Sequence, residues 1–303
     1  MTELTYCNGE IRSGQELSIS VLDAGFVQGV TVSEQLRTFG GKLFALDEHF
    51  ARLRRSLEVV GLQDIDLDNL RAEAGVIASH NHSLQQPGDD IGLTIFVTPG
   101  LPPVLKRSVE AERSVGMSTT PLPFHRWADN YANGVSLVVT SVRQVPANCW
   151  PPELKCRSRM HYFLADREAQ NARPGARALL LDQEGFIAEA STASVLVYRE
   201  AEGFVAPRPE KVLPSISVGM LRKLAETLEI DCIHRDITID DVRSANEVLL
   251  MSTSPCLLPV TSIDGDNIGS GEPGPVFTKL LAAWSSHVET DIVGQARQFA
   301  YRG

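Results

Sequence analysis

The chain has 303 residues and a mass of 33.1 kDa, which is enough for two domains of ordinary size. Hydrophobic residues make up 43% of the chain and charged residues 22%, a balance typical of folded globular proteins and unlike that of disordered chains. The formal net charge of −10 has the wrong sign for a protein that binds nucleic acid or an anionic membrane, so we expect neither as a partner.

Cysteine usage and the first residues bear on metal sites and targeting. The five cysteines are an odd number, widely spaced, with no CxxC pair and no Cys/His cluster, so we predict neither a disulfide framework nor a metal site. The start MTELTYCNGE is polar where a signal peptide would be apolar, and no apolar run approaches the ~18 residues of a membrane span. A cytoplasmic location is therefore expected.

The N-terminal half predicts hairpins followed by helices. Asn8-Gly9 supplies the positive φ angles of a tight hairpin turn, and Gly40-Gly41 favours a second one after the strand-like VSEQLRTF. The apolar spacing beyond it predicts, in chain order, a helix capped by Asp47 and ending at Gly61, a helix over 67–79 and a buried strand over 91–100.

The composition changes between about residues 120 and 133, where an aromatic and proline-bearing stretch precedes the β-prone GVSLVVTSVR. The elements predicted beyond it are a helix over 158–172, a hairpin around 183–185, a strand over 193–200, a helix from Pro214, and strands on either side of Ser252–Pro255. Strands and helices do not alternate regularly, so we predict an α+β fold. We expect a smaller N-terminal α/β domain over 1–122, a linker over 123–133 and a larger, mixed C-terminal domain over 134–303.

Three charged residues stand in contexts that favour more than a solvated surface. Glu189 lies in a predicted strand of apolar and small residues, where a buried carboxylate needs a charged or hydrogen-bonding partner. Arg52 follows His49 by about one turn on an amphipathic helix, so it could reach an anion or form a surface salt bridge. Lys155 follows a double proline before a predicted helix. Most lysines are solvated surface residues, so Lys155 is a candidate only because Glu189 and Arg52 occur in the same chain.

Two stretches could hold an anion. A helix that begins near Pro214 leaves the first-turn amides of Ile216 and Ser217 at the positive end of the helix dipole. The strand that ends near Met251 opens into small residues, Thr253 and Ser254 among them, whose hydroxyls and amides can approach a ligand closely. Either stretch could also be ordinary capping.

These residues lie in motifs that resemble the class IV pyridoxal-phosphate aminotransferases. This fold type IV family includes branched-chain aminotransferase, D-amino-acid aminotransferase and aminodeoxychorismate lyase, and the resemblance covers nearly the whole chain. Its motifs are DAGFVQG (23–29), EQLRTFGGKLFALDEHFARL (34–53), Lys155 ahead of a helix ending in ADREA, EGFIAEAS (184–191), LPSIS (213–217) and MSTSPCLLPVTSIDGDNIGSGEPGP (251–275). The resemblance implies a two-domain enzyme with pyridoxal 5′-phosphate (PLP) between the domains, and a homodimer.

The resemblance also implies roles for single residues. Lys155 would form the Schiff base with the cofactor aldehyde and carry a proton between the substrate α-carbon and the cofactor. Glu189 would pair with the pyridine nitrogen and keep it protonated. The cofactor phosphate would be held by Arg52, Ile216, Ser217 and Thr253.

The substrate side departs from the family pattern. Gln28 and Ser33 stand where relatives commonly place aromatic residues, and together with Ser254 they are the candidate substrate-binding residues. Amide and hydroxyl groups favour amino donors with polar or carboxylate-bearing side chains over valine, leucine and isoleucine. The group that holds the substrate carboxylate stays open among Lys106, Arg107, Arg157 and Arg159.

Three functions are compatible with these residues. The first is a PLP-dependent aminotransferase that moves an amino group between an amino acid and a 2-oxo acid. The alternative is a lyase of the aminodeoxychorismate type that releases pyruvate; Arg159 favours it, whereas Gln35 has no acidic proton to give the departing enamine. The third is a cofactor-binding protein without activity, which the joint presence of Lys155, Glu189 and Arg52 argues against.

Overall fold

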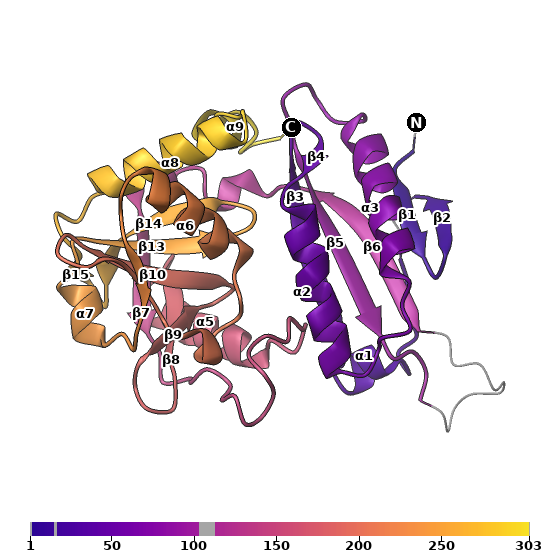
Figure 1. Ribbon diagram of the computed structural model, residues 1–303, viewed down its shortest axis with the longest axis horizontal. Coiled ribbons are helices and arrows are strands. Elements are labelled where there is room, and N and C mark those ends of the chain that lie inside the picture. The colour runs from indigo at the N-terminus through magenta and orange to yellow at the C-terminus, as the bar shows by residue number, and fades with distance from the viewer. Residues whose placement is uncertain (1, 15–16, 103–112, 303) are drawn as a thin grey trace. The chain divides into compact units, whose positions relative to one another are not determined.

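The structure is a computed structural model that describes residues 2–14, 17–102 and 113–302. It divides into two compact units, labelled by element in Figure 1. The N-terminal unit comprises Met1–Leu122 with Glu153–Ser158, and the C-terminal unit comprises Pro123–Pro152 with Arg159–Gly303. Residues 153–158, which fall inside the C-terminal domain expected from the sequence, thus cluster with the N-terminal unit.

The N-terminal unit is an antiparallel sheet covered by helices. Its strands follow the order β2-β1-β6-β5-β3-β4. Their bounds are β1 Leu4–Cys7, β2 Glu10–Ser13, β3 Val32–Phe39, β4 Lys42–Leu43, β5 Ile91–Thr98 and β6 Ser114–Pro121, and the helices are α1 Ala24–Val27, α2 Leu46–Val59 and α3 Leu67–His82. Both predicted hairpins are confirmed, and Asn8 and Gly9 have the expected positive φ angles of 48° and 91°.

The predicted cap of α2 is wrong. The helix begins at Leu46 after Ala45, whose φ of 50° turns the chain, so Asp47 lies in the first turn. An acidic side chain is stabilised there by the helix dipole without being the cap. α3 is capped by Asp66, which accepts a hydrogen bond from the Asn69 amide at 3.0 Å, and it continues to His82, beyond the predicted end.

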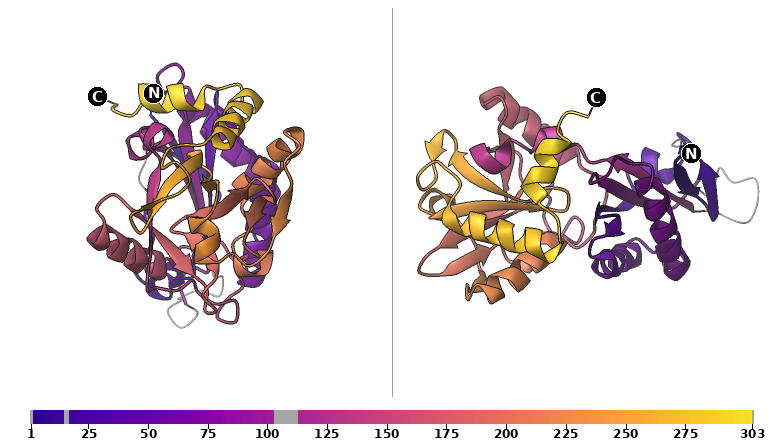
Figure 2. Two further views of the ribbon diagram at one scale, coloured as in Figure 1. Left: turned by 90° about the vertical axis from the view of Figure 1, so that its left-hand side faces the viewer. Right: turned by 90° about the horizontal axis from the view of Figure 1, so that it is seen from above.

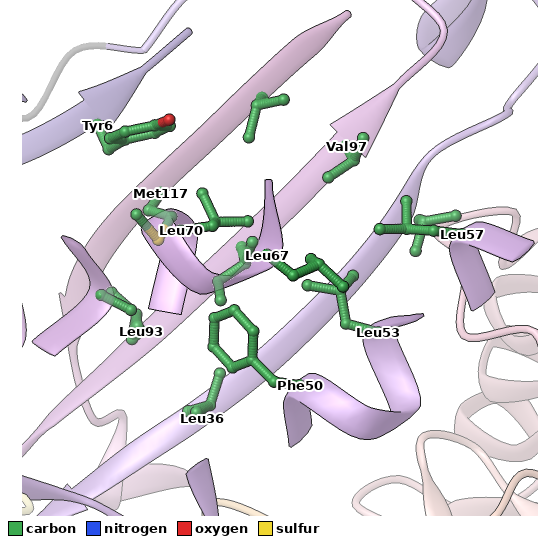
Figure 3. Close-up of a cluster of buried hydrophobic side chains, with 14 of the residues drawn as sticks. Tyr6, Leu36, Phe50, Leu53, Leu57, Leu67, Leu70, Leu93, Val97 and Met117 are labelled. Carbon is green, nitrogen blue, oxygen red and sulfur yellow. The ribbon is translucent and has the colours of Figure 1, made fainter. Parts of the chain in front are cut away.

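The core of the N-terminal unit lies between the sheet and the helices. Figure 2 shows α2 and α3 on the same side of the sheet, and Figure 3 shows their apolar side chains meeting those of the strands. The labelled residues are Phe50, Leu53 and Leu57 from α2, Leu67 and Leu70 from α3, and Tyr6, Leu36, Leu93, Val97 and Met117 from the strands. Because side chains alternate along a strand, the face of β3 that carries Leu36 also carries Glu34, whereas Ser33 and Gln35 point to the opposite face.

The C-terminal unit is a mixed sheet that closes on itself. Its strand order is β12-β11-β10-β13-β14-β7-β8-β9, and β9 also pairs with β10, so the described strands from β10 to β9 form a closed barrel. The strand bounds are β7 Val135–Val139, β8 Arg177–Leu181, β9 Ile187–Ala190, β10 Ala193–Arg199, β11 Gly203–Ala206, β12 Cys232–His234, β13 Glu247–Ser252, β14 Cys256–Ile263 and β15 Asp266–Asn267.

Helices surround this sheet. They are η2 Phe124–Arg126 and α4 Asn130–Asn133, which occupy the expected linker, followed by α5 Met160–Ala172, η3 Pro209–Lys211, α6 Ile216–Thr227, α7 Ile239–Arg243, α8 Pro275–His287 and α9 Ile292–Gln298. The predicted start of α6 at Pro214 is wrong by two residues, because Ser215 is the cap and accepts a hydrogen bond from the Val218 amide at 3.3 Å. Within the described part of the chain, no helix is both long and apolar enough to cross a membrane.

Candidate active site

Lys155 lies in a short segment that hydrogen-bonds to β3 and α2 of the N-terminal unit. The Ser33 amide donates to the Lys155 carbonyl at 3.0 Å, and the Lys155 amide donates to the Ser56 hydroxyl at 3.1 Å. An isolated antiparallel β-bridge between the backbones of Cys156 and Val32 pairs the segment with the start of β3. The backbone of Lys155 is therefore held on both sides, ahead of the first residue of α5 rather than inside that helix.

A buried ion pair lies between α2 and the helix-covered face of β3. The Nε and Nη2 atoms of Arg52 donate to the two carboxylate oxygens of Glu34, each at 2.7 Å, and Nδ1 of His49 lies 2.7 Å from Glu34 Oε2. Arg52 is 4% exposed and Glu34 is 1% exposed, so the surface salt bridge considered for Arg52 is wrong. The pair is bidentate and buried, the strong form of an arginine–carboxylate contact.

The ionisation of this cluster follows from its contacts. Burial by itself would raise the pKa of Glu34, but the charge and hydrogen bonds of Arg52, with smaller contributions from His49 and Lys155, lower this pKa to about 2. Burial lowers the pKa of His49, against the opposing effect of Glu34. At neutral pH the cluster therefore contains an anionic Glu34, a cationic Arg52 and a neutral His49, whose Nδ1–H donates to the carboxylate.

Glu189 is a buried carboxylate of the C-terminal unit, and it is 6% exposed. Its Oε2 accepts hydrogen bonds from the Tyr162 hydroxyl at 2.6 Å and from the Gln144 amide at 3.1 Å. Its Oε1 accepts a hydrogen bond from the Leu213 amide at 3.0 Å. The expected need of this carboxylate for hydrogen-bonding partners is confirmed.

The strand register places the strand that leads to Thr253 two strands away from Glu189. Ser194 of β10 pairs with Glu189 on one side and with Met251 of β13 on the other, so these three residues form one row across the barrel wall. Thr253 follows Met251 by two residues, in the turn between β13 and β14. This turn is fixed by the Tyr131 hydroxyl, which donates to the Pro255 carbonyl at 2.8 Å.

The LPSIS segment meets the same carboxylate. Leu213 donates to Glu189, and Ile216 and Ser217 form the first turn of α6, with Ser217 buried. Both residues therefore present first-turn amides at the positive end of a helix. The C-terminal unit thus brings together Glu189 and the predicted anion-binding helix start.

The predicted substrate-binding residues are more scattered. Ser33 is 1% exposed and pairs with Phe96 of β5, directly beside the Lys155 backbone. Gln28 is exposed at the end of α1, and Ser254 is half-buried in the turn after β13. Lys106 and Arg107 lie outside the described residues. Among the residues that are described, no group of three or more His, Cys, Asp or Glu side chains could hold a metal ion.

Three residues of the site are not predicted from the sequence, namely Glu34, Tyr162 and Gln144. Glu34 could have been found, because a charged residue on the core face of an apolar strand carries the same signal that pointed to Glu189. Tyr162 and Gln144 have no local signal, since each contacts Glu189 only through the tertiary fold.

Comparison with known proteins shows the family to which the chain belongs. The family described as "Amino-transferase class IV" matches residues 31–263. The chain is 28% identical over 281 residues to a D-alanine aminotransferase of Bacillus licheniformis, covering 93% of this chain and 95% of the relative.

Two solved structures show the same fold. The T.th. branched-chain amino acid aminotransferase with pyridoxamine 5′-phosphate has a TM-score of 0.82 at 23% identity, covering 97% of this chain and 95% of that one. The Escherichia coli branched-chain amino acid aminotransferase has a TM-score of 0.85 at 20% identity, covering 94% of each chain. The chain therefore belongs to the class IV aminotransferase family, and it is a PLP-dependent aminotransferase of fold type IV.

Proposed function

We propose that the protein moves an amino group between an amino acid and a 2-oxo acid, with Lys155 as the residue that binds PLP covalently. The observation that carries this proposal is the placement of Lys155, whose backbone is hydrogen-bonded to β3 on one side and to α2 on the other. A fixed backbone lets the amine bond the cofactor aldehyde in one orientation and, once displaced by an amino-acid substrate, move a proton at the α-carbon.

The residues of the C-terminal unit fit the other parts of PLP. When bound, PLP supplies a protonated pyridine ring that withdraws electrons from the substrate α-carbon. Glu189 would hold the proton on the ring nitrogen, since it is a buried carboxylate whose described donors stabilise its anionic form. The first-turn amides of Ile216 and Ser217 and the hydroxyl of Thr253 would hold the phosphate.

Arg52 is the remaining phosphate contact of the proposal. Its guanidinium is anchored to Glu34 through Nε and Nη2, which fixes its direction before any ligand binds. Preorganised donors of this kind bind a dianionic phosphate more tightly than mobile ones, because less side-chain entropy is lost on binding.

For the amino donor, we propose a preference for polar or carboxylate-bearing side chains. Ser33 is the residue that supports this preference, because it is buried beside the Lys155 backbone. It places a polar hydroxyl at a strand position where relatives commonly place an apolar aromatic side chain. The relative named D-alanine aminotransferase brings D-alanine into the group of donors to be tested.

A homodimer is also part of the proposal. Four large apolar side chains in and before α1 are exposed, namely Val21, Leu22, Phe26 and Val27. Exposed large apolar side chains that follow one another along a short segment are more typical of a protein interface than of a solvated surface. Light scattering after size-exclusion chromatography should give twice the mass of the chain, and Phe26→Asp should shift the protein toward the monomer.

The covalent role of Lys155 is tested by borohydride reduction of the PLP-loaded protein, followed by peptide mass mapping. We expect the pyridoxyl group on Lys155, and no labelling of Lys155→Ala, with Lys223→Ala on the exposed face of α6 as the matched control. An adduct on another lysine contradicts the assignment. The donor is then identified by assaying D- and L-alanine, glutamate and leucine with 2-oxoglutarate and pyruvate as acceptors.

A further inference from the structure

The Glu189 carboxylate is held by two side chains to which the function proposed above gives no role. Tyr162 and Gln144 both donate to Oε2, at 2.6 Å and 3.1 Å, while the Leu213 amide donates to Oε1. Gln144 Nε2 also lies 3.4 Å from the Tyr162 hydroxyl, so the two donors and the carboxylate oxygen form a closed triangle. All three described donors are neutral groups.

The environment of Tyr162 keeps its hydroxyl protonated, so that it donates a hydrogen bond to Glu189. Tyr162 lies in the first turn of α5 and packs against a buried cluster that includes Val138, Ala165 and Ala169. Burial, together with the neighbouring Glu189 charge, raises the pKa of Tyr162 well above its ordinary value. The hydroxyl therefore keeps its proton throughout the pH range in which enzymes of this kind are assayed.

Gln144 is fixed through its backbone. Its amide donates to the Leu181 carbonyl at 2.9 Å, and its own carbonyl accepts a hydrogen bond from Gln183 Nε2 at 2.9 Å. The side-chain amide has one favourable orientation, because a rotation that exchanged its oxygen and nitrogen would place the oxygen against the Glu189 carboxylate.

We propose that Tyr162 and Gln144 are positioning residues, which keep the Glu189 carboxylate anionic and in one orientation so that it holds a proton on the ring nitrogen of PLP. This inference rests on the proposed pairing of Glu189 with that nitrogen. Neutral donors suit the task, since they stabilise the anion without contributing a positive charge that would repel the pyridinium.

The inference predicts where the ring proton resides. The pair can exist as carboxylate with pyridinium or as carboxylic acid with neutral pyridine, and donors to the carboxylate favour the first form. Removing the Tyr162 hydroxyl therefore moves the proton toward Glu189 and weakens the electron withdrawal of the ring. A purely structural tyrosine would leave the protonation of the ring nitrogen unchanged.

The test compares the PLP-loaded wild type with Tyr162→Phe, using PLP labelled with ¹⁵N in the ring. We expect the ¹⁵N resonance of the variant to move toward that of an unprotonated pyridine, and kcat to fall about 10- to 100-fold, as for the loss of one hydrogen bond to a charged group. Tyr198→Phe is the matched control, since the Tyr198 hydroxyl makes no hydrogen bond with the described residues. It should retain the wild-type resonance and rate.

A second variant keeps the test decisive if Tyr162→Phe folds poorly. Gln144→Met preserves the length of the side chain but removes its donor, and it should move the resonance in the same direction with a roughly 3- to 10-fold loss of kcat. Wild-type resonance and kcat in a folded variant of either kind overturn the positioning role. If instead wild-type PLP shows an unprotonated ring nitrogen, or no bond to Lys155, the underlying proposal for Glu189 or Lys155 fails.

Discussion

Glu34 in the N-terminal unit and Glu189 in the C-terminal unit are both buried carboxylates, and they are stabilised in different ways. Glu34 in the N-terminal unit pairs with a cation, Arg52, and accepts a further hydrogen bond from His49. Glu189 in the C-terminal unit accepts its described hydrogen bonds from Tyr162, Gln144 and a backbone amide, which are all neutral.

This difference predicts different consequences when the charge is removed. Neutralising Glu34 leaves the Arg52 cation buried without its counterion, which costs folding free energy. Neutralising Glu189 leaves neutral donors beside a neutral amide, which is a smaller loss to folding. We therefore expect the first carboxylate to matter most for stability and the second for chemistry.

The largest expected effect is on folding. Glu34→Gln should lower the free energy of unfolding at pH 7 by about 3 to 5 kcal/mol, the usual cost of breaking a buried ion pair. Urea unfolding followed by circular dichroism measures this loss. Glu58→Gln, at an exposed position on the helix that carries Arg52, is the control, with an expected change within about 0.5 kcal/mol. A loss at Glu34 as small as that at Glu58 would show that the pair contributes little.

The same variant has a pH signature. The folded pKa of Glu34, about 2, lies below its ordinary value of 4.5, so the folded protein holds this proton less tightly than the unfolded chain. The stabilisation is complete above about pH 4.5 and is lost as the pH falls toward 2. The difference in unfolding free energy between wild type and Glu34→Gln should therefore narrow from pH 6 to pH 3. A constant difference would mean that the charge of Glu34 is not its cause.

The next effect is on turnover. Glu189→Gln should retain PLP but lower kcat by about 10² to 10³, because an amide does not keep the ring nitrogen protonated. Its free energy of unfolding should fall less than that of Glu34→Gln. Steady-state kinetics at saturating PLP, beside urea unfolding of both variants, makes the comparison directly. Turnover within a factor of two of wild type would mean that Glu189 does not face the ring.

A smaller effect is expected on cofactor affinity. Arg52→Ala would leave the buried Glu34 anion without its cation, so we place it in the Glu34→Gln background, where a neutral amide replaces the carboxylate. There it should raise the dissociation constant of PLP a further ~10- to 100-fold, the cost of one charge-assisted contact, while kcat at saturating PLP largely recovers. If Glu34→Gln and the double variant bind PLP with equal affinity, Arg52 does not contact the phosphate and serves only as the counterion of Glu34.

These comparisons also show what the sequence could predict. Turn chemistry located the hairpin at Asn8-Gly9, and apolar periodicity located α2, because both signals are local. The start of α6 was misplaced because proline and serine both favour helix starts, and the hydrogen bond from Val218 to Ser215 decides between them.

The least predictable features of the site depend on long-range contacts. Residues 153–158 pack with β3, which lies more than a hundred positions earlier in the chain, and no local pattern reports such a pairing. Tyr162 and Gln144 reach Glu189 from 27 and 45 positions away. The sequence could thus identify Glu189 as a buried carboxylate, whereas its hydrogen-bond partners could be found only from the fold.

The smallest expected effect is on the choice of amino donor. Ser33 points away from the helix-covered face of β3, is buried, and lies beside the Lys155 backbone, while Gln28 is exposed, so the expected preference rests mainly on Ser33. A buried hydroxyl left unpaired by an aliphatic substrate costs ~1 to 3 kcal/mol, so glutamate should exceed leucine about 10-fold in kcat/KM. Ser33→Ala should reduce this ratio and Ser33→Phe should reverse it, because the aromatic ring supplies an apolar contact for leucine. Equal kcat/KM values for glutamate and leucine in the wild type would show that Ser33 does not contact the donor side chain.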